Sequence, residues 1–196
     1  MFVKRFEELA SSVRDCVYTI ESAPASQASA LTKAHQMISN VQESQGVVYV
    51  IGNGGSAGIA SHFSNDLMKA LQIPSQTLYD TNLLTCLAND IGYENIFSYP
   101  LSKYIKKNDT LVAISSSGNS MNIVNAAKVA LEKETPIITF TGFQAANKLR
   151  QLGALNFWID RSDYGLVETA HFFLLHTIVD LWQKKPIFGH KVCSNH

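Results

Sequence analysis

Two loops rich in glycine and hydroxyl side chains constrain this sequence most, because each directly follows an apolar run. The first loop, residues 52–58 (Gly-Asn-Gly-Gly-Ser-Ala-Gly), follows the apolar residues 47–51. The second, residues 115–120 (Ser-Ser-Ser-Gly-Asn-Ser), follows residues 111–114. Small side chains after a parallel strand expose backbone N–H groups at the start of the next helix, where the helix dipole also favours anions. The loops therefore predict an anion site, and the serines indicate a phosphorylated, hydroxyl-rich small molecule.

The apolar pattern around these loops alternates between strand-like and helix-like periods. It predicts strands at 47–51, 76–79, 110–114, 136–140 and 155–159, and helices at 56–71, 82–91, 97–106, 120–133, 144–152 and 165–183. Apolar residues that recur every three or four positions from Phe2 to Ile20 predict an earlier helix, and another covers about 26–45. Strands that alternate with helices are typical of an α/β fold with a parallel sheet covered on both faces.

Composition bounds the class of protein. A chain of 196 residues fits a single domain, with N-terminal helices at 1–45, an α/β core at 46–183 and a tail at 184–196. Lysine plus arginine and aspartate plus glutamate number 16 each, so no basic excess points to nucleic acid. No apolar run approaches the ~18 residues that span a bilayer. We therefore expect no nucleic-acid partner and no membrane insertion.

Charge content and cysteines add two further expectations. Charged residues make up 16% of the chain and hydrophobic ones 46%, which suits a protein that buries surface in subunit contacts. We assign these contacts to the N-terminal helices. The cysteines Cys16, Cys86 and Cys193 are scattered and odd in number, which fits a reduced, cytoplasmic setting.

The two loops allow other interpretations. Gly52, Gly54 and Ala57 fit the relaxed Gly-x-Gly-x-x-Gly/Ala fingerprint of dinucleotide-binding folds, with Asp80 as the ribose ligand. That interpretation leaves the serine loop unexplained. Plain strand–helix turns are the other alternative, but one capping hydroxyl would suffice for a turn. We favour phosphate binding by Ser115, Ser116, Ser117 and Ser120.

A second group of polar residues lies on the predicted helices. His62 and Asp66 are four residues apart and so share a helix face. Glu168, His171 and His176 interrupt the apolar pattern of the last helix, where Glu168 and His176 could line one cavity. Such groups need partners when buried. They could be acid–base groups, a metal site with two histidines and two carboxylates, or, for any single histidine, a satisfied core residue.

Several motifs together resemble the sugar isomerase (SIS) domain family, and within it the phosphoheptose isomerases, over nearly the whole chain. The motifs are Gly52-Asn53-Gly54-Gly55-Ser56, Ser61-His62-Phe63, Asn89-Asp90-x-Gly92, Ile96-Phe97-Ser98 and Ser115-x-Ser117-Gly118-Asn119-Ser120. The resemblance implies a flavodoxin-like three-layer sandwich with a five-stranded parallel sheet, in a cytoplasmic homotetramer. It also implies an aldose–ketose isomerase that converts sedoheptulose 7-phosphate to D-glycero-D-manno-heptose 7-phosphate through an enediolate, for lipopolysaccharide or other surface glycans.

The resemblance also implies roles by position. Substrate contacts would come from Asn53, Gly54, Gly55, Asn89, Asp90 and Glu168, and phosphate contacts from Ser115, Ser116, Ser117 and Ser120. Asp66 stands where the family usually has a zinc-binding glutamate base, and Glu168 where it usually has a glutamine ligand. The implied zinc ligands are His62, Asp66, Glu168 and His176, and the implied catalytic groups are Asp66, Glu168 and His176. The two departures leave open which carboxylate is the base.

Two other functions compete with this one. A non-catalytic protein of the same fold, of the kind that binds the bacterial replication initiator, resembles the isomerases in its loops but does not keep the polar cluster. The presence of His62, Asp66 and His176 argues against it. The other alternative is an isomerase or sensor for a different phosphosugar.

Overall fold

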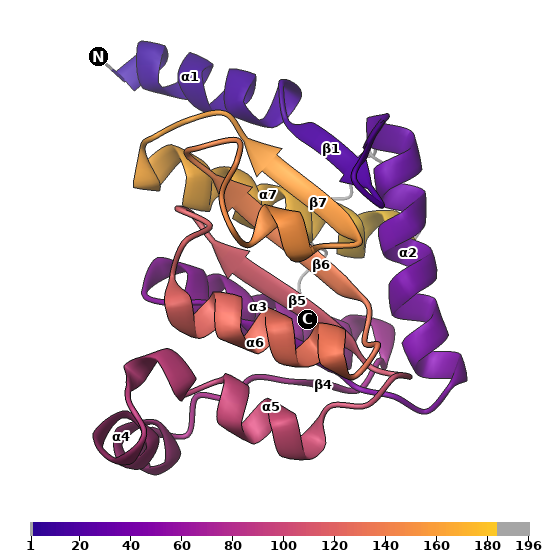
Figure 1. Ribbon diagram of the computed structural model, residues 1–196. Helices are drawn as coiled ribbons and strands as arrows, with labels where there is room; N and C mark the ends of the chain where they lie inside the picture. The colour runs from indigo at the N-terminus through magenta and orange to yellow at the C-terminus, as the bar shows by residue number, and fades with distance from the viewer. Residues whose placement is uncertain (1, 184–196) are drawn as a thin grey trace, which may run out of the picture.

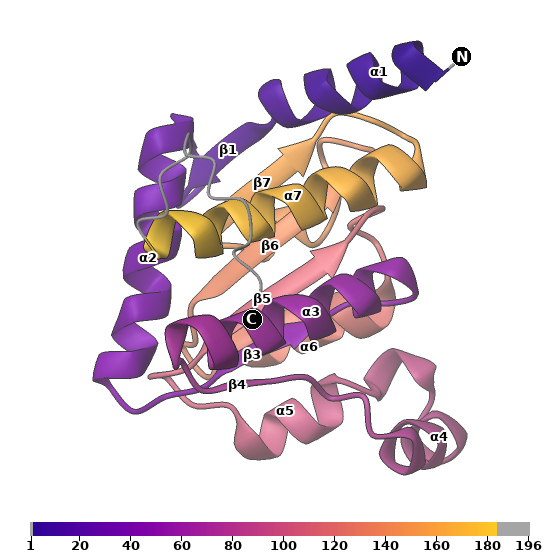
Figure 2. The same cartoon turned by 180° about the vertical axis from the view of Figure 1, so that it is seen from behind.

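The computed structural model describes residues 2–183, so the tail predicted at 184–196 lies outside the described residues. Figures 1 and 2 show the molecule from opposite sides. In chain order the elements are α1 (Phe2–Arg14), β1 (Val17–Ile20), β2 (Ala23–Ala25), α2 (Gln27–Glu43), β3 (Val48–Ile51), α3 (Gly55–Leu71), β4 (Ser75–Gln76), α4 (Thr81–Asp90), η1 (Tyr93–Asn95), α5 (Ser98–Tyr104), β5 (Thr110–Ser115), α6 (Met121–Glu132), β6 (Ile137–Gly142), η2 (Arg150–Leu152), β7 (Leu155–Ile159) and α7 (Tyr164–Trp182).

Within residues 2–183 the strands form one sheet of seven strands in the order β2-β1-β7-β6-β5-β3-β4. The five strands from β7 to β4 are parallel, whereas β1 pairs antiparallel with both β7 and β2. Numbered along the chain, the parallel strands have the order 2-1-3-4-5, which is the flavodoxin-like order. The predicted α/β class is confirmed, but the sheet has seven strands and not five.

The predicted N-terminal helix is wrong beyond Arg14, because β1 replaces its last residues, and β2 forms between it and the helix predicted at about 26–45. The segment Val17–Ile20 consists of β-branched and aromatic residues, which favour a strand. Glu21 and Ser22 both have positive φ, 47° and 66°, as a two-residue type I′ hairpin turn requires. Because the sequence lacks the Asn-Gly signal of such turns, apolar spacing alone gave no sign of the hairpin.

The predicted helix at 144–152 is also wrong, since only the short 3₁₀ turn η2 forms there. Asn147 supplies the physical reason. Its Nδ2 donates to the carbonyl oxygen of Gln144 over 2.9 Å, and its Oδ1 accepts from the backbone N–H of Arg150 over 2.9 Å. Such local bonds offer the backbone an alternative to a helix. The strand predicted at 76–79 is likewise reduced to Ser75–Gln76.

Helices cover both faces of the sheet. On one face α2, α3 and α7 pack around an apolar cluster that includes Phe63, Phe140 and Phe157. On the other, α4, α5 and α6 pack around a second cluster that includes Phe97 and Leu101. Figure 2 shows α3 and α7 side by side on the face towards the viewer, where they contact each other. No helix within residues 2–183 is both long and apolar enough to cross a membrane.

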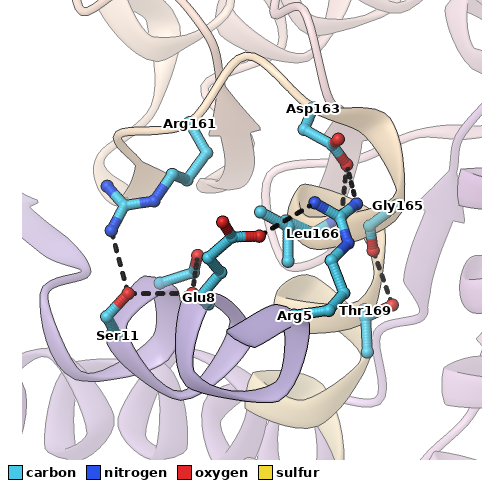
Figure 3. A network of polar contacts seen from close by, with 9 residues as sticks. Arg5, Glu8, Ser11, Arg161, Asp163, Gly165, Leu166 and Thr169 are labelled. Carbon is cyan, nitrogen blue, oxygen red and sulfur yellow. Dashed lines mark hydrogen bonds and ion pairs between the residues drawn. The ribbon is translucent and has the colours of Figure 1, made fainter. Parts of the chain in front are cut away.

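A polar network fixes α1 to the start of α7 (Figure 3). Arg5 Nη2 lies 2.6 Å from Asp163 Oδ1, and the same carboxylate oxygen caps α7 by accepting the backbone N–H of Leu166 over 3.0 Å. Arg161 Nη2 donates to Ser11 Oγ over 3.0 Å. Asp163 therefore begins α7 and also holds α1 against it.

Candidate active site

The site lies at the carboxyl edge of the sheet, where the strand order reverses. β3 and β5 are neighbours, while the chain continues from β3 outward to β4 on one side and from β5 to β6 on the other. Ligands of open α/β sheets bind in the crevice at such a switch point. The loops that follow β3 and β5 are the glycine-rich and serine loops of the sequence, so the topology brings them together.

Tyr79 fixes the backbone at the start of the glycine-rich loop. The Tyr79 hydroxyl accepts from the N–H of Gly52 over 2.8 Å and donates to its carbonyl oxygen over 3.0 Å. Burial raises the pKa of Tyr79, which keeps the hydroxyl protonated and able to donate. Gly54 directly precedes α3 with a φ of 53°, a conformation that glycine adopts readily. The loop therefore leads into α3 with a fixed backbone and without bulky side chains.

The serine loop keeps hydroxyl groups available for a ligand. Ser116 Oγ is buried and has no hydrogen-bond partner within the described part of the chain. Ser120 begins α6 but makes no capping hydrogen bond, and its Oγ lies 3.4 Å from that of Ser115. Ser117 Oγ accepts from the backbone N–H of Asn119 over 3.2 Å. Hydroxyls and the start of a 12-residue helix together form a suitable anion site.

A pair of asparagines joins the two loops. Asn53 and Asn122 exchange two amide hydrogen bonds of 2.9 and 2.8 Å, and the Tyr93 hydroxyl donates to Asn53 Oδ1 over 3.2 Å. A cavity of about 460 Å³ lies beside the pair, lined by Asn53, Tyr93, Glu94, Ser120, Met121 and Asn122. Sequence reasoning missed Asn122 and Tyr93. An asparagine among the apolar residues that α6 buries was the available signal for Asn122.

Asn89 and Asp90 are exposed residues at the end of α4. Asn89 Nδ2 donates to Asp90 Oδ1 over 2.9 Å, and Cys86 Sγ lies 3.3 Å from the other carboxylate oxygen. These donors, Asn89 first, lower the pKa of Asp90. In this chain the two predicted substrate contacts bond within α4, and no hydrogen bond found in residues 2–183 links them to the serine loop.

Three predicted residues meet between α3 and α7. Asp66 Oδ2 lies 3.4 Å from His62 Nε2 and 3.5 Å from His176 Nδ1. The His62 and His176 side chains are 48% and 41% exposed, so a ligand can reach them. Phe172 packs against both imidazoles, with ring centroids 5.1 and 4.5 Å away. The two helices thus present a carboxylate between two imidazoles on an accessible surface.

The donor set of this cluster fits a metal ion. One ligand atom from each of His62, Asp66 and His176 lies within 4.8 Å of the others. Two ligands about 2.1 Å from a tetrahedral zinc ion are about 3.4 Å apart. The two nitrogen–oxygen separations in the cluster, 3.4 and 3.5 Å, agree with that spacing. Glu168 is not among these three residues, although the sequence placed it with them.

Glu168 lies instead over the first turn of α3. A Cβ atom added to Gly55 would come within 2.2 Å of Glu168 Oε2, so the carboxylate occupies the space that glycine leaves. Burial raises the pKa of Glu168. Because Glu168 precedes His176 by eight residues, it lies about 12 Å further towards the start of α7. The carboxylate therefore adjoins the glycine-rich loop at one end of the α3–α7 contact, and the His–Asp–His cluster lies further along both helices.

His171, between these positions, is a core residue. It is fully buried, and its Nε2 lies 3.0 Å from the carbonyl oxygen of Thr141. Desolvation lowers the pKa of His171 to about 4, so the ring is neutral at physiological pH. A larger cavity, of about 840 Å³, lies between α2 and the starts of β5 and β6 and contains none of the predicted site residues.

Comparison with known proteins places this chain in a family. The family model of the SIS domain matches residues 13–142. The chain belongs to the SIS domain family. Two curated members, both phosphoheptose isomerases, match most of this SIS-domain chain. The one from Helicobacter pylori is 30% identical over 168 residues, 83% of this chain and 86% of the relative. The one from Chromohalobacter salexigens is 32% identical over 164 residues, 80% of this chain and 83% of the relative.

A solved structure supports the fold of this SIS domain. The phosphoheptose isomerase of Neisseria gonorrhoeae matches with a TM-score of 0.80 over 93% of this chain and 97% of that chain. At 24% identity the likeness shows the shared fold. The additional strands and the loops at the switch point therefore belong to an SIS domain whose parallel strands have the flavodoxin-like order.

Proposed function

We propose that this protein is an aldose–ketose isomerase that converts sedoheptulose 7-phosphate to D-glycero-D-manno-heptose 7-phosphate, a heptose for lipopolysaccharide or other surface glycans. One observation carries the proposal. The Asp66 carboxylate lies between the imidazoles of His62 and His176, on α3, and α3 begins directly after the glycine-rich loop. The phosphoheptose isomerases among the relatives support the same reaction.

The reaction moves protons within the substrate. A base removes a proton from C1 of the ketose, the C–H electron pair forms the C1=C2 bond of an enediolate, and the C2 oxygen takes a proton. A proton then returns to C2 while O1 loses one, which gives the aldehyde. The site must supply a base, an acid and donors for the oxygens.

Asp66, Glu168 and His176 are the groups that we assign to proton transfer. His176 adjoins Asp66, and its exposed imidazole can pass a proton to or from a substrate oxygen. Glu168 has a pKa raised by burial, which suits an acid–base group. Either Asp66 or Glu168 serves as the base at C1, and substitution of each by its amide separates the two.

The remaining predicted residues bind the substrate in this proposal. The phosphate is held at the start of α6 by Ser115, Ser116, Ser117 and Ser120. The Ser116 hydroxyl, which has no partner within the described residues, donates a hydrogen bond to a phosphate oxygen. Contacts to the rest of the sugar come from Asn53, Gly54, Gly55, Asn89, Asp90 and Glu168. Asn89 and Asp90, the last two residues of α4, are exposed, so a ligand can reach them from the solvent side.

We propose zinc as the metal of the His–Asp–His cluster. His62, Asp66 and His176 would hold it, since mixed nitrogen and oxygen ligands at this spacing suit zinc. Glu168, the fourth ligand that the resemblance implies, lies beside Gly55 and outside this group of three, so we do not assign it to the metal. A bound divalent ion would polarise the substrate oxygens at C1 and C2 as a Lewis acid.

We further propose a cytoplasmic homotetramer that uses α1 in its interface. Phe2, Val3 and Phe6 are large apolar residues on α1, and each is more than 60% exposed in the single chain. A non-catalytic role on the same fold is less well supported, because it would leave the converging groups of α3 and α7 unused. Another phosphosugar substrate is the alternative that the experiment below distinguishes.

Incubation with sedoheptulose 7-phosphate in D₂O tests the reaction. We expect an aldose 7-phosphate by NMR, with deuterium at C2 because the enediolate is reprotonated from exchangeable groups. Fructose 6-phosphate and ribulose 5-phosphate serve as shorter comparison substrates. Asp66→Asn and Glu168→Gln each preserve shape, and the variant that loses C1 proton exchange identifies the base. No product and no exchange with any of the three sugars would refute the proposal.

Metal content tests the zinc site separately. We expect the purified protein to hold about one zinc ion per chain, and His62→Ala to lose it together with activity. His35→Ala, a histidine on α2 outside the cluster, is the matched control. A fully active wild type that holds no metal and is insensitive to chelators would exclude the metal while leaving the acid–base roles intact.

A further inference from the structure

The hydrogen bonds between Asn53 and Asn122 connect the two ligand loops by side chains alone. Asn53 belongs to the glycine-rich loop, and Asn122 lies in the first turn of α6, directly after the serine loop. The Asn122 side chain is almost completely buried, at 2% exposure. Neither residue can therefore move without disturbing the other.

A backbone group determines which way both amides face. The N–H of Ile123, which also donates to the carbonyl oxygen of Ser120 over 3.0 Å, donates to Asn122 Oδ1 over 3.0 Å, and a backbone N–H can only donate. The oxygen of Asn122 is thereby identified, so its nitrogen faces Asn53 Oδ1 and its oxygen also accepts from Asn53 Nδ2. The hydroxyl of Tyr93 donates to the same Asn53 Oδ1, in agreement with this orientation.

The pair consequently has unused donors and no unused acceptors. Asn122 Oδ1 accepts from Ile123 and Asn53, and Asn53 Oδ1 accepts from Asn122 and Tyr93. An amide oxygen has two lone pairs, so both oxygens are satisfied. Each amide nitrogen has used one of its two hydrogens. Both residues line the 460 Å³ cavity together with Ser120 of the phosphate-type loop.

We infer that Asn122 is a positioning residue that holds Asn53 with a free N–H available to the cavity, where it donates to an oxygen of the phosphorylated ligand. The inference rests on the proposed function for the identity of the sugar, but not for the presence of an anionic, oxygen-rich ligand. It assigns specificity to a residue of α6 that acts through the neighbouring loop. An amide that offers only donors selects an acceptor and rejects a group that must itself donate.

Asn122→Asp tests this role with almost no change in shape. An aspartate keeps the bond from Ile123, but it offers only acceptors, so either orientation of Asn53 leaves two oxygens facing each other. We expect the dissociation constant for inorganic phosphate, measured by calorimetry, and the KM for sedoheptulose 7-phosphate to rise by about tenfold, as for a lost charge-assisted hydrogen bond. Because Asn122 does not touch the reacting carbons, kcat should change less than KM.

Two controls separate positioning from charge and from folding. Asn125→Asp adds the same charge one turn further along α6, where Asn125 bonds only to the carbonyl oxygen of Glu94. It should change both constants by less than about twofold, because Asn125 neither lines the cavity nor contacts Asn53. Asn122→Ala adds no charge and should weaken binding in the same direction, and it carries the test if the aspartate variant does not fold.

A double-mutant cycle decides whether Asn122 acts through Asn53. In an Asn53→Ala background, Asn122→Asp should add little further loss, since the amide that it positions is gone. Additive losses, equal effects of the Asn122 and Asn125 aspartates, or a wild type that binds no phosphate at millimolar concentration would each overturn the inference. If phosphate binding follows the expected pattern while no sugar is isomerised, the proposed function fails and the positioning role stands.

Discussion

Burial separates two histidines of α7 that look alike in the sequence. His171 is fully buried, and its Nδ1 has no partner in the described structure, while the His176 side chain is 41% exposed beside Asp66. The first is held neutral by desolvation, which lowers its pKa to about 4. The second can exchange protons with a ligand. Only His176 is therefore placed to act in a reaction.

The low pKa of His171 predicts a pH-dependent stability. The unfolded chain protonates this histidine near pH 6.5 and the folded state only near pH 4, so stability is full above pH 6.5 and is lost as the pH falls towards 4. Between pH 7.5 and pH 5.5 this group should lower the free energy of unfolding by about 1 kcal/mol.

Urea unfolding of His171→Gln at both pH values measures this effect. Glutamine keeps a donor for the carbonyl of Thr141 but does not titrate, so the variant should lose that part of the pH dependence. His35→Gln on α2, which replaces a solvent-exposed histidine, is the control. Identical pH dependence in wild type and His171→Gln would show that His171 does not titrate on unfolding as its burial requires.

At the scale of elements, two glycines of α3 predict opposite results of one substitution. A Cβ at Gly55 would meet the Glu168 carboxylate at 2.2 Å, whereas a Cβ at Gly58 would have nothing within 4 Å. Gly55→Ala should displace the end of a flexible side chain, preserve the fold and reduce kcat by about tenfold or more, as for misplacement of a catalytic group. Gly58→Ala should stabilise the protein by about 0.5–1 kcal/mol and keep its activity.

Thermal unfolding and steady-state kinetics on the two variants check this pair. Each is the other's control, because both add one methyl group to the same helix three residues apart. Full activity in Gly55→Ala would mean that the position of Glu168 is unimportant for the reaction. A loss of activity in Gly58→Ala would place a ligand or a neighbouring subunit on that face of α3.

The elements also show where sequence reasoning reaches its limit. The five parallel strands and both ligand loops follow from apolar periods and glycine positions, because these patterns report burial and backbone conformation directly. The β1–β2 hairpin escaped, since Val17 and Ile20 fit a helical spacing as well as a strand, and Glu21 and Ser22 are unusual residues for its turn. The helix predicted at 144–152 does not form because the Asn147 side chain bonds to the backbone there, and the spacing of apolar residues gives no information on such bonds.

The candidate site was predicted in part for the same reasons. His62, Asp66 and His176 meet because i,i+4 spacing places His62 and Asp66 on one face of α3, and α3 packs against α7 on the same side of the sheet. Glu168 shares a face with His176 in projection, yet the rise along α7 carries it to Gly55 and away from the cluster. Asn122 escaped because its role depends on a partner 69 residues earlier.

At the scale of the whole molecule, α1 predicts the assembly state. Its exposed Phe2 and Phe6 are 84% and 63% accessible, although Arg5 between them is fixed to Asp163 at the start of α7. A helix held in place with its apolar side uncovered is suited to subunit contact. Light scattering should therefore give a tetramer at micromolar concentration.

Phe6→Asp should break this assembly into smaller species, because a carboxylate cannot be buried there without a partner. Lys4→Asp, an exposed position on the same helix, should leave the mass unchanged. Because α1 is bonded to the start of α7, and Glu168 lies in the second turn of that helix, we expect dissociation to lower activity as well. A monomeric wild type, or a Phe6→Asp variant of unchanged mass, would contradict the assignment of α1.

The edges of the sheet determine how copies of this protein can associate. The outermost strands are β2, three residues with Pro24 at the centre, and β4, two residues that directly follow Pro74. Proline offers no N–H for a further strand, and edges this short give little template for pairing. Growth by strand addition is thereby blocked at both ends, so crowded solutions of the folded protein should resist edge-to-edge fibre formation, and helical faces are left as the surfaces through which molecules join.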